Sequence, residues 1–346
     1  MVNAVEESGY KVYFLQQVIN RQAFFMFSFE ELSAKFAQHF ATRHFPAEPA
    51  SLYDANDYFL KMGGKRVRPV LCLMGNELFD NIDADAWHAA TAVELFHNFT
   101  LVHDDIMDKA PLRRGMPTVH EKYGTATALL AGDVMLVIAY DYLNKIKENY
   151  QRVIIHLFNK TAREVCEGQQ MDMDFENREA VPFDEYIRMI ELKTSVLLAA
   201  SLQIGAVIGG ASQHNQQHLY EFGKNLGIAF QVQDDYLDAF GDPGKVGKQP
   251  GGDIVANKKT FLIIKAMETA NAEQRNALLK LMKGNATDKV QQVLDIFRAC
   301  GVDQWAFRLK EQYIEQAFDH LEKIAVVSTR KEQLKSLARF LVQREY

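Results

Sequence analysis

The stretch that decides the fold class is Trp87–Asp108, which reads WHAATAVELFHNFTLVHDDIMD. Apolar side chains recur in it at intervals of three and four residues: Val93, Leu95, Phe96, Phe99 and Val102. This spacing lines one face of an α-helix. The chain has no sustained alternation of apolar and polar residues, and no Asn-Gly or Asp-Gly turn joins two strands. The sequence therefore predicts an all-α protein.

The same helical periodicity continues along the rest of the chain, in the segments Thr125–Tyr142, Val153–Cys166, Ser195–Ile208, Leu219–Tyr236, Thr260–Met267 and Trp305–Arg344. Turn-forming residues separate the helices at Pro46–Pro49, Met62–Gly64, Lys109–Pro117, Asn177–Pro182 and Gly241–Gly252. None of these is a long, low-complexity linker, and no repeat is evident. We predict a single domain over residues 1–346, with residues 1–50 as an N-terminal helical extension.

Composition narrows the class of protein. Of the 346 residues 48% are hydrophobic and 24% charged, which excludes a disordered chain. A formal net charge of −6 disfavours general nucleic-acid binding, which needs a basic face. The cysteines Cys72, Cys166 and Cys300 include no C-x-x-C pair, so neither a disulfide framework nor a structural zinc site is expected.

Neither a signal peptide nor a membrane span is predicted. The N-terminal stretch carries two early glutamates and lacks a signal-peptide core. The most apolar run, Ser195–Gly210, contains Ser201 and Gln203 and is shorter than the roughly 18–20 residues that a span requires. We expect a buried core helix there, and a cytoplasmic protein.

Two aspartate clusters with one spacing carry the first functional signal. Asp104, Asp105 and Asp108 form D-D-x-x-D, and Asp234, Asp235 and Asp238 repeat it. Carboxylates one turn apart project from one helix face and repel each other. A single cluster could be a solvated acidic face, but two in one helical chain indicate facing walls of a cavity. Carboxylate oxygens suit Mg²⁺, which commonly bridges protein to phosphate.

Cationic residues follow at the turns beside both clusters. Residues 63–69 read G-G-K-R-V-R-P, Arg113 and Arg114 follow the first cluster, and Lys245, Lys248, Lys258 and Lys259 follow the second. Arginine contacts phosphate oxygens in pairs and lysine as a point charge. Within this set we expect Arg66 to be an ordinary surface charge. The pattern predicts a phosphate group held through divalent ions.

At this point the chain resembles the trans-isoprenyl diphosphate synthases, or polyprenyl synthetases, of the short-chain type that makes geranylgeranyl or farnesyl diphosphate. The resemblance runs in order from Met62 to Lys265. It rests on GGKRVRP at 63–69, ELFHNFTLVHDDIMD at 94–108, RRG at 113–115, EGQQMD at 167–172, KTS at 193–195, QVQDDYLD at 231–238, GK at 247–248 and GD at 252–253. It implies antiparallel helices around a deep central cavity, in a homodimer.

The resemblance also implies roles for individual residues. Asp104 and Asp108 would ligate two Mg²⁺ ions and Asp234 a third, with Asp105 and Asp238 supporting them and Mn²⁺ a possible substitute. The allylic diphosphate would be held by Arg113, Lys193, Thr194, Gln231, Lys248 and Lys258. The diphosphate of isopentenyl diphosphate would be held by Lys65, Arg68, His97 and Arg114. Taken alone, His97 could equally be a core or dimer-face histidine.

Two details depend on this chain's own sequence. It has Asn257-Lys258-Lys259 where many members have a glycine before the last lysine, so either lysine could be the ligand, and we choose Lys258. Phe99, five residues before Asp104, would floor the product tunnel, with Thr100 leaving some space beside it. An aromatic residue there resembles short-chain enzymes and predicts a C15 to C20 product, with geranylgeranyl diphosphate favoured.

Two other functions remain as alternatives. A class I terpene cyclase also ionises an allylic diphosphate, but its second metal motif mixes Asn or Asp with Ser or Thr and Glu, and it has no use for Lys65, Arg68 and His97. A catalytically silent partner subunit would be expected to have lost aspartates from one cluster, and both are intact here.

Overall fold

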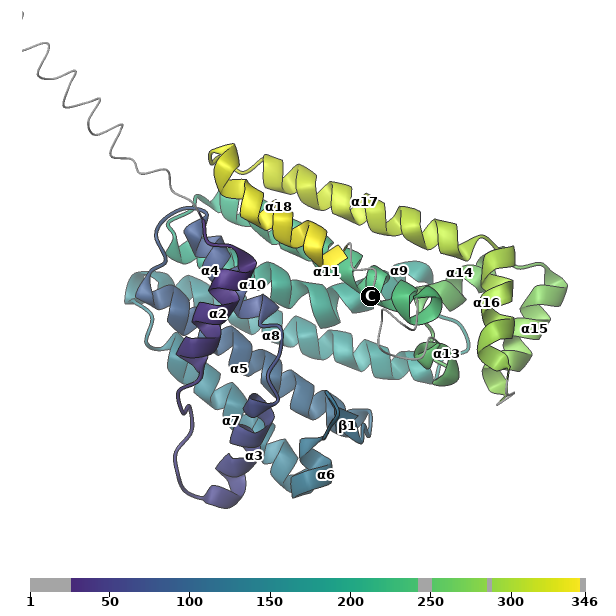
Figure 1. Ribbon diagram of the computed structural model, residues 1–346, viewed down its shortest axis with the longest axis horizontal. Coiled ribbons are helices and arrows are strands. Elements are labelled where there is room, and N and C mark those ends of the chain that lie inside the picture. The colour runs from purple at the N-terminus through teal and green to yellow at the C-terminus, as the bar shows by residue number, and fades with distance from the viewer. Residues whose placement is uncertain (1–25, 242–250, 285–287, 343–346) are drawn as a thin grey trace, which may run out of the picture.

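A computed structural model describes residues 26–241, 251–284 and 288–342 (Figure 1). The first half contains α2 (Phe29–Phe40), α3 (Ala50–Lys61), α4 (Val67–Glu77), α5 (Ala84–Met107), α6 (Val119–Tyr123), α7 (Thr125–Leu143) and α8 (Glu148–Glu176). After these come α9 (Phe183–Ile190), the π-helical turn η1 (Glu191–Ser195), α10 (Val196–Ile208) and α11 (Gln213–Phe240). The remaining helices are α13 (Gly252–Val255), α14 (Phe261–Thr269), α15 (Ala272–Lys283), α16 (Lys289–Ala299), α17 (Val302–Glu322) and α18 (Ser328–Val342). The predicted all-α class is confirmed.

The centre of the bundle is α10, in which every residue except Gln203 is buried. It packs against α4, α5, α8 and α11 (Figure 1). Because such a helix meets protein on all sides, its sequence is apolar all round. The expectation of a buried core helix at Ser195–Gly210 is therefore confirmed.

The buried apolar side chains form two adjoining clusters. The larger one is built on α4, α5, α7 and α10 and the smaller one on α9, α14 and α16. Helix α11 serves both, with Leu226 in the larger and Val232 in the smaller, and Met171 of α8 packs against both. Helix α11, which carries the second aspartate cluster, thus runs along the junction of the two apolar clusters, and so does the end of α8.

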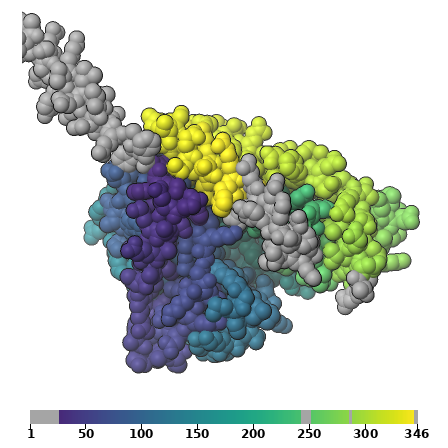
Figure 2. All heavy atoms as spheres, in the orientation of Figure 1, coloured from purple at the N-terminus to yellow at the C-terminus, as the bar shows by residue number. Residues whose placement is uncertain are grey.

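The described part of the N-terminal extension belongs to this core. Ser28 caps α2 in a reciprocal pair with Glu31, and Phe36 is fully buried. Figure 2 shows α2 in purple beside α18 in yellow, where the rings of Phe29 and Phe340 lie 6.3 Å apart.

One short hairpin departs from the expectation that no sheet forms. Strands β1 (Leu112–Arg113) and β2 (Met116–Pro117) pair antiparallel within the predicted turn. Arg114 (φ 53°) and Gly115 (φ 76°) join them, and two positive φ angles are typical of a tight hairpin turn. The usual Asn-Gly signal is missing because an arginine takes the first left-handed position.

Two helices are long and apolar enough to cross a membrane by length and composition. The first, Phe183–Ile208, is 78% buried in its most apolar window and is core. The second, Thr125–Leu143, is only 33% buried there. Helix α7 therefore presents an apolar face that the other described residues do not cover.

The buried carboxyl group of Glu77 gives a prediction about stability. It accepts a hydrogen bond from the backbone N–H of Phe27 at 3.1 Å, and burial raises its pKa from 4.5 to about 7. Between these pH values the unfolded chain has lost the proton and the folded one keeps it, so stability falls as the pH rises. Glu77→Gln should remove this loss, on the order of 1–3 kcal/mol, and stabilise the protein at pH 8 more than at pH 5. Urea unfolding at both pH values measures it, and an equal gain at both would contradict it.

Candidate active site

The first aspartate cluster lies at the end of α5, against the hairpin. Asp105 is buried, and the Nε of Arg113 donates to both of its carboxylate oxygens at 2.9 and 2.8 Å. Arg113 Nη2 also lies 2.8 Å from Asp105 Oδ1 and 3.8 Å from Asp104 Oδ2. Asp105 thus holds Arg113 beside Asp104. With both of its oxygens engaged, Asp105 supports the site through Arg113.

One carboxylate oxygen of Asp104 is available to a ligand. Its Oδ1 is buried without a hydrogen-bond partner in the described part of the chain, and the nearest cation, Lys193 Nζ, is 3.6 Å away. Lys193 instead donates to Asp172 Oδ2 at 2.5 Å. Burial lowers the pKa of Lys193, but the carboxylates of Asp104, Asp172 and Asp108 outweigh that, and the net shift is upward. Lys193 is therefore a fixed cation in the site.

Lys258 connects the first cluster to the second. Its Nζ lies 3.5 Å from Asp253 Oδ1, and after the opposing effect of burial the charges of Asp253, Asp108 and Asp172 raise its pKa. The backbone N–H of Asp253 in turn donates to Asp238 Oδ2 at 2.9 Å. Acidic residues from both predicted clusters therefore share one electrostatic environment.

Repulsion within this environment is already visible at Asp108. Its side chain reaches solvent, yet desolvation by the surrounding protein and then the charge of Asp104 raise its pKa, while Lys193 and Lys258 oppose the shift. Such a site gains stability from added positive charge.

In the second cluster, Asp235 is the buried member. The Tyr186 hydroxyl donates to its Oδ2 at 2.6 Å and Gln231 Nε2 donates to its Oδ1 at 2.8 Å. Burial raises the pKa of Asp235 to about 7, although both hydrogen bonds lower it. Asp234, one residue earlier, is exposed. Gln231, predicted as a diphosphate ligand, here orients Asp235.

These donors fit a hydrated divalent cation. The site offers Asp104 Oδ1, the accessible Asp108 and the exposed Asp234, all hard oxygen ligands. Among the described residues no three His, Cys, Asp or Glu side chains are gathered as a ready metal cage. Mg²⁺ suits such an arrangement, because it keeps several waters and takes one or two carboxylates together with substrate phosphates.

A cationic pocket lies two turns back along α5, around His97, and at the start of α4. Arg68 Nη1 donates to His97 Nε2 at 3.1 Å, and the Nε of Arg68 is buried without a partner in the described residues. Burial lowers the pKa of Arg68 to about 10, and it lowers that of His97 well below 6.5, helped by Arg68, Arg114 and Arg113. His97 is therefore a neutral acceptor that aims the Arg68 guanidinium.

Arg66 contradicts its prediction as a surface charge. It forms a buried ion pair with Glu94 and lies over the Phe40 ring, 4.9 Å from the centroid. Its backbone is left-handed (φ 53°) at the start of α4, so the chain turns there between the exposed Lys65 and the half-buried Arg68. The error arose because the carboxylate partner lies 28 residues away, where no local pattern reveals it.

Arg114 completes the basic pocket. Its guanidinium lies against Gly64, where an added Cβ would come within 3.1 Å of it. Burial and then the neighbouring Arg113 and Arg66 lower the pKa of Arg114, and Glu94 opposes them. A cluster of cations whose charges lower one another's pKa is stabilised when an anion binds to it.

A cavity of about 340 Å³ joins the two halves of the site. Seven predicted residues line it: Arg68, His97, Phe99, Thr100, Asp104, Lys193 and Thr194. The remainder of its wall includes apolar side chains such as Met107, Val165 and Leu197. A single cavity, which we call the chamber, is therefore lined by a candidate metal ligand, by residues of the basic pocket and by apolar side chains.

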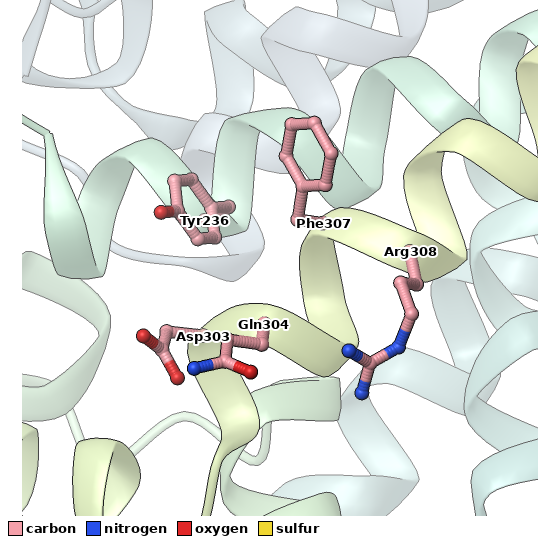
Figure 3. A pocket seen from close by; sticks show the side chains of 5 residues that line it. All are labelled: Tyr236, Asp303, Gln304, Phe307 and Arg308. Carbon is pink, nitrogen blue, oxygen red and sulfur yellow. The ribbon is translucent and has the colours of Figure 1, made fainter.

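A second hollow, of about 370 Å³, opens between α11 and the start of α17. It is lined by Tyr236, Asp303, Gln304, Phe307 and Arg308, and the last four come from α17 (Figure 3). None of these is a predicted site residue, and this hollow shares no lining residue with the chamber.

Three contributors to the site were not predicted as site residues, although two of them lie in segments that carry the family resemblance. Asp172 lies at the end of the EGQQMD segment, Asp253 in the GD pair, and Tyr186 in no quoted motif. Lys259, the alternative to Lys258, is occupied elsewhere, since its Nζ donates to the carbonyls of Phe175, Glu176 and Arg178. Lys245 and Lys248 lie outside the described residues.

Gly168 sets the position of Lys193 and gives a second prediction. A Cβ on Gly168 would lie 2.3 Å from the Lys193 backbone nitrogen, so α8 and η1 meet backbone to backbone. The π-helical turn is the kind of local irregularity found at functional sites. Gly168→Ala should push Lys193 out of register and lower kcat about tenfold. Steady-state kinetics with circular dichroism would test this, and a folded variant with unchanged kcat would contradict it.

Comparison with known proteins agrees with this geometry. A family model described as polyprenyl synthetase matches residues 49–300. A geranylgeranyl diphosphate synthase of Methanosarcina mazei is 39% identical over 302 residues, covering 86% of this chain and 91% of that protein. A geranylgeranyl pyrophosphate synthase of Geoglobus acetivorans is 40% identical over 303 residues, covering 86% and 92%.

The fold gives the same result. A crystal structure of a geranylgeranyl pyrophosphate synthase superposes with a TM-score of 0.88 at 41% identity, covering 93% of this chain and 100% of that one. The similarity in sequence and the similarity in fold thus extend over most of the chain. The chain belongs to the polyprenyl synthetase family, as a short-chain trans-isoprenyl diphosphate synthase.

Proposed function

We propose that this prenyltransferase makes geranylgeranyl diphosphate from isopentenyl diphosphate and allylic diphosphates of C5 to C15, with three Mg²⁺ ions in each active site. The observation that carries the proposal is the single cavity shared by Asp104, Lys193, Arg68, His97 and Phe99. It supports two diphosphate subsites above one apolar tunnel. The names of the relatives from Methanosarcina mazei and Geoglobus acetivorans support the C20 product.

The metal-bound half is assigned to the allylic substrate. Asp104 and Asp108 would ligate two ions and Asp234 the third, while Asp105 and Asp238 hold neighbouring groups in place. The allylic diphosphate would contact Arg113, Lys193, Thr194, Gln231, Lys248 and Lys258. Support comes from the ion pairs of Lys193 with Asp104 at 3.6 Å and of Lys258 with Asp253 at 3.5 Å. Each ammonium group carries three N–H donors and can donate to phosphate oxygens as well.

The basic half is assigned to isopentenyl diphosphate, held by Lys65, Arg68, His97 and Arg114. The unpaired Nε of Arg68 supports this assignment, because a buried donor without a partner gains most from an anionic ligand. His97, neutral beside three arginines, can donate its remaining ring N–H to a phosphate oxygen.

The reaction breaks the allylic C–O bond, forms a carbon–carbon bond to isopentenyl diphosphate and releases a proton and pyrophosphate. Divalent ions, when bound, neutralise charge on the leaving diphosphate. Arg113, Lys193 and Lys258 add fixed positive charge at the same place, where it costs no reorganisation during the reaction. Breaking the C–O bond leaves an allylic cation. Arg68 and His97 would hold isopentenyl diphosphate so that its double bond lies next to this cation. The proton passes to the departing pyrophosphate.

Product length is assigned to Phe99, which lines the cavity with Thr100. Phe99→Ala would open the floor of the tunnel and should shift the main product by at least one C5 unit. Product chromatography after extended incubation measures the shift. Thr194→Ser, a small change at the diphosphate end of the same cavity, serves as the control and should leave product length unaltered. Unchanged products in Phe99→Ala would reject the floor.

A homodimer in the cytoplasm completes the proposal. Helix α7 presents the exposed apolar side chains Leu129, Leu130 and Val137, a face suited to a second copy of the chain. The free thiols of Cys72, Cys166 and Cys300 are consistent with a reducing compartment. Sedimentation of the wild type and of Leu130→Glu with Val137→Glu would test the dimer.

The deciding experiment is turnover by the purified chain alone. Labelled isopentenyl diphosphate with each allylic starter and Mg²⁺ should give C20 product, and EDTA should abolish it. Absence of turnover would favour a silent partner subunit, and consumption of the allylic substrate without isopentenyl diphosphate would favour a cyclase.

A further inference from the structure

His103 is a residue to which the reaction assigns no task, although it lies between Phe99 and Asp104 along the cavity wall. It follows Phe99 by one helical turn on α5, and both side chains line the cavity. The two rings meet edge to face, with centroids 4.8 Å apart and planes at 66°. This arrangement is favourable for aromatic pairs and fixes one ring relative to the other.

The other side of the His103 ring rests on α7. Its Nε2 lies 3.1 Å from the backbone carbonyl oxygen of Leu129 and 3.8 Å from Asp133 Oδ1. Gly132 provides the space: a Cβ built there would lie 2.3 Å from Nε2 and 2.4 Å from Cδ2 of the imidazole. The ring therefore fills a notch in α7 that only a glycine leaves open.

Phe99 is supported from a second side by Phe96, whose ring centroid lies 5.6 Å away. Phe96 is itself buried and packed against Phe158 at 5.2 Å. The Phe99 ring thus rests against a fixed aromatic group on one side and His103 on the other. Of these two supports, His103 is the one that reaches the cavity.

We propose that His103 is a positioning residue for product length: its imidazole, wedged against α7 at Gly132, holds the Phe99 ring across the tunnel. This inference rests on the proposed function, in which Phe99 is the floor. Without the wedge the Phe99 ring can turn into the space that His103 leaves, and the tunnel deepens. The notch at Gly132 on α7 thereby contributes to the selection of product length.

Three variants separate ring packing from hydrogen bonding. His103→Ala removes both, His103→Asn keeps a polar group able to donate to the Leu129 carbonyl, and His103→Phe keeps an aromatic ring without it. Each is incubated with Mg²⁺, labelled isopentenyl diphosphate and the C15 allylic starter, and products are separated by chain length. Thermal unfolding of each variant with diphosphate bound identifies any that fails to fold.

The inference predicts that His103→Ala and His103→Asn raise the share of products longer than the wild-type main product at least threefold, while His103→Phe keeps the wild-type distribution. The KM for isopentenyl diphosphate should stay within about twofold in all three, which general disruption of the site would not allow. If His103→Ala does not fold, the pair of Asn and Phe variants still decides the matter.

A comparison with Phe99→Ala distinguishes this inference from the floor itself. In a Phe99→Ala background His103→Ala should add no further lengthening, because the ring that it positions is gone. Wild-type products from His103→Ala and His103→Asn, alongside longer products from Phe99→Ala, would overturn the role of His103 and leave the floor standing. Wild-type products from Phe99→Ala as well would overturn both.

Discussion

Asp104→Asn is expected to lower kcat by about three orders of magnitude while the protein stays folded. The substitution keeps the size of the side chain and removes the negative charge. Asp104 Oδ1 is buried and has no hydrogen-bond partner in the described residues, so losing its charge leaves a site for a cation without its ligand. Steady-state rates over a range of Mg²⁺ concentrations measure the effect, and the Mg²⁺ requirement should rise with the loss of kcat.

Asp295→Asn is the matched control. Asp295 lies on α16 with its side chain 62% exposed, and it forms an ion pair with Arg298, three residues away. The same chemical change there should leave both kcat and the Mg²⁺ requirement unaltered. An Asp104→Asn enzyme with near wild-type kcat at low Mg²⁺ would show that the first cluster is not a metal ligand.

Arg68→Met is expected to raise the KM for isopentenyl diphosphate about a hundredfold and to leave the KM for the allylic substrate within twofold. Methionine fills a similar volume and removes a charge-assisted contact, which is worth roughly 1.5–3 kcal/mol. The selectivity follows from geometry, because Arg68 pairs with His97 in the basic pocket. In the described part of the chain no hydrogen bond or ion pair links Arg68 to the aspartate clusters.

Two further variants sharpen this result. Arg68→Lys keeps the charge without the planar fork and should recover part of the affinity. Arg308→Met changes an exposed arginine in the separate hollow of Figure 3 and should have no effect. Equal increases in the KM of both substrates in Arg68→Met would contradict the division into two subsites.

The helical core and the two aspartate clusters could be predicted because each has a local period. Apolar residues at three and four mark the helix Trp87–Val102, and D-D-x-x-D places Asp104 and Asp108 on one face of a helix end. The basic segments could also be predicted, since they lie at or beside turns that glycine and proline mark in the sequence. In each case residues that act together are close in sequence.

The burial and the pairing of individual site residues could not be predicted, because they depend on contacts between residues that are distant in sequence. Arg66 looks like its neighbours Lys65 and Arg68, and only the fold brings Glu94 to it. Asp104 and Asp105 are adjacent and identical, but the helix buries one against Arg113 and leaves an oxygen of the other without a hydrogen bond from any described residue. Tyr186 becomes part of the site only through its hydrogen bond to Asp235, 49 residues away. Burial and pairing of this kind leave no periodic pattern in the sequence.

The most direct measurement is anomalous diffraction from crystals grown with Mn²⁺ and an unreactive allylic thiodiphosphate. The account predicts Mn²⁺ peaks on both sides of one diphosphate, with Asp104 and Asp108 as ligands on one side and Asp234 on the other. Peaks at one cluster alone, or a diphosphate bound away from both, would contradict it.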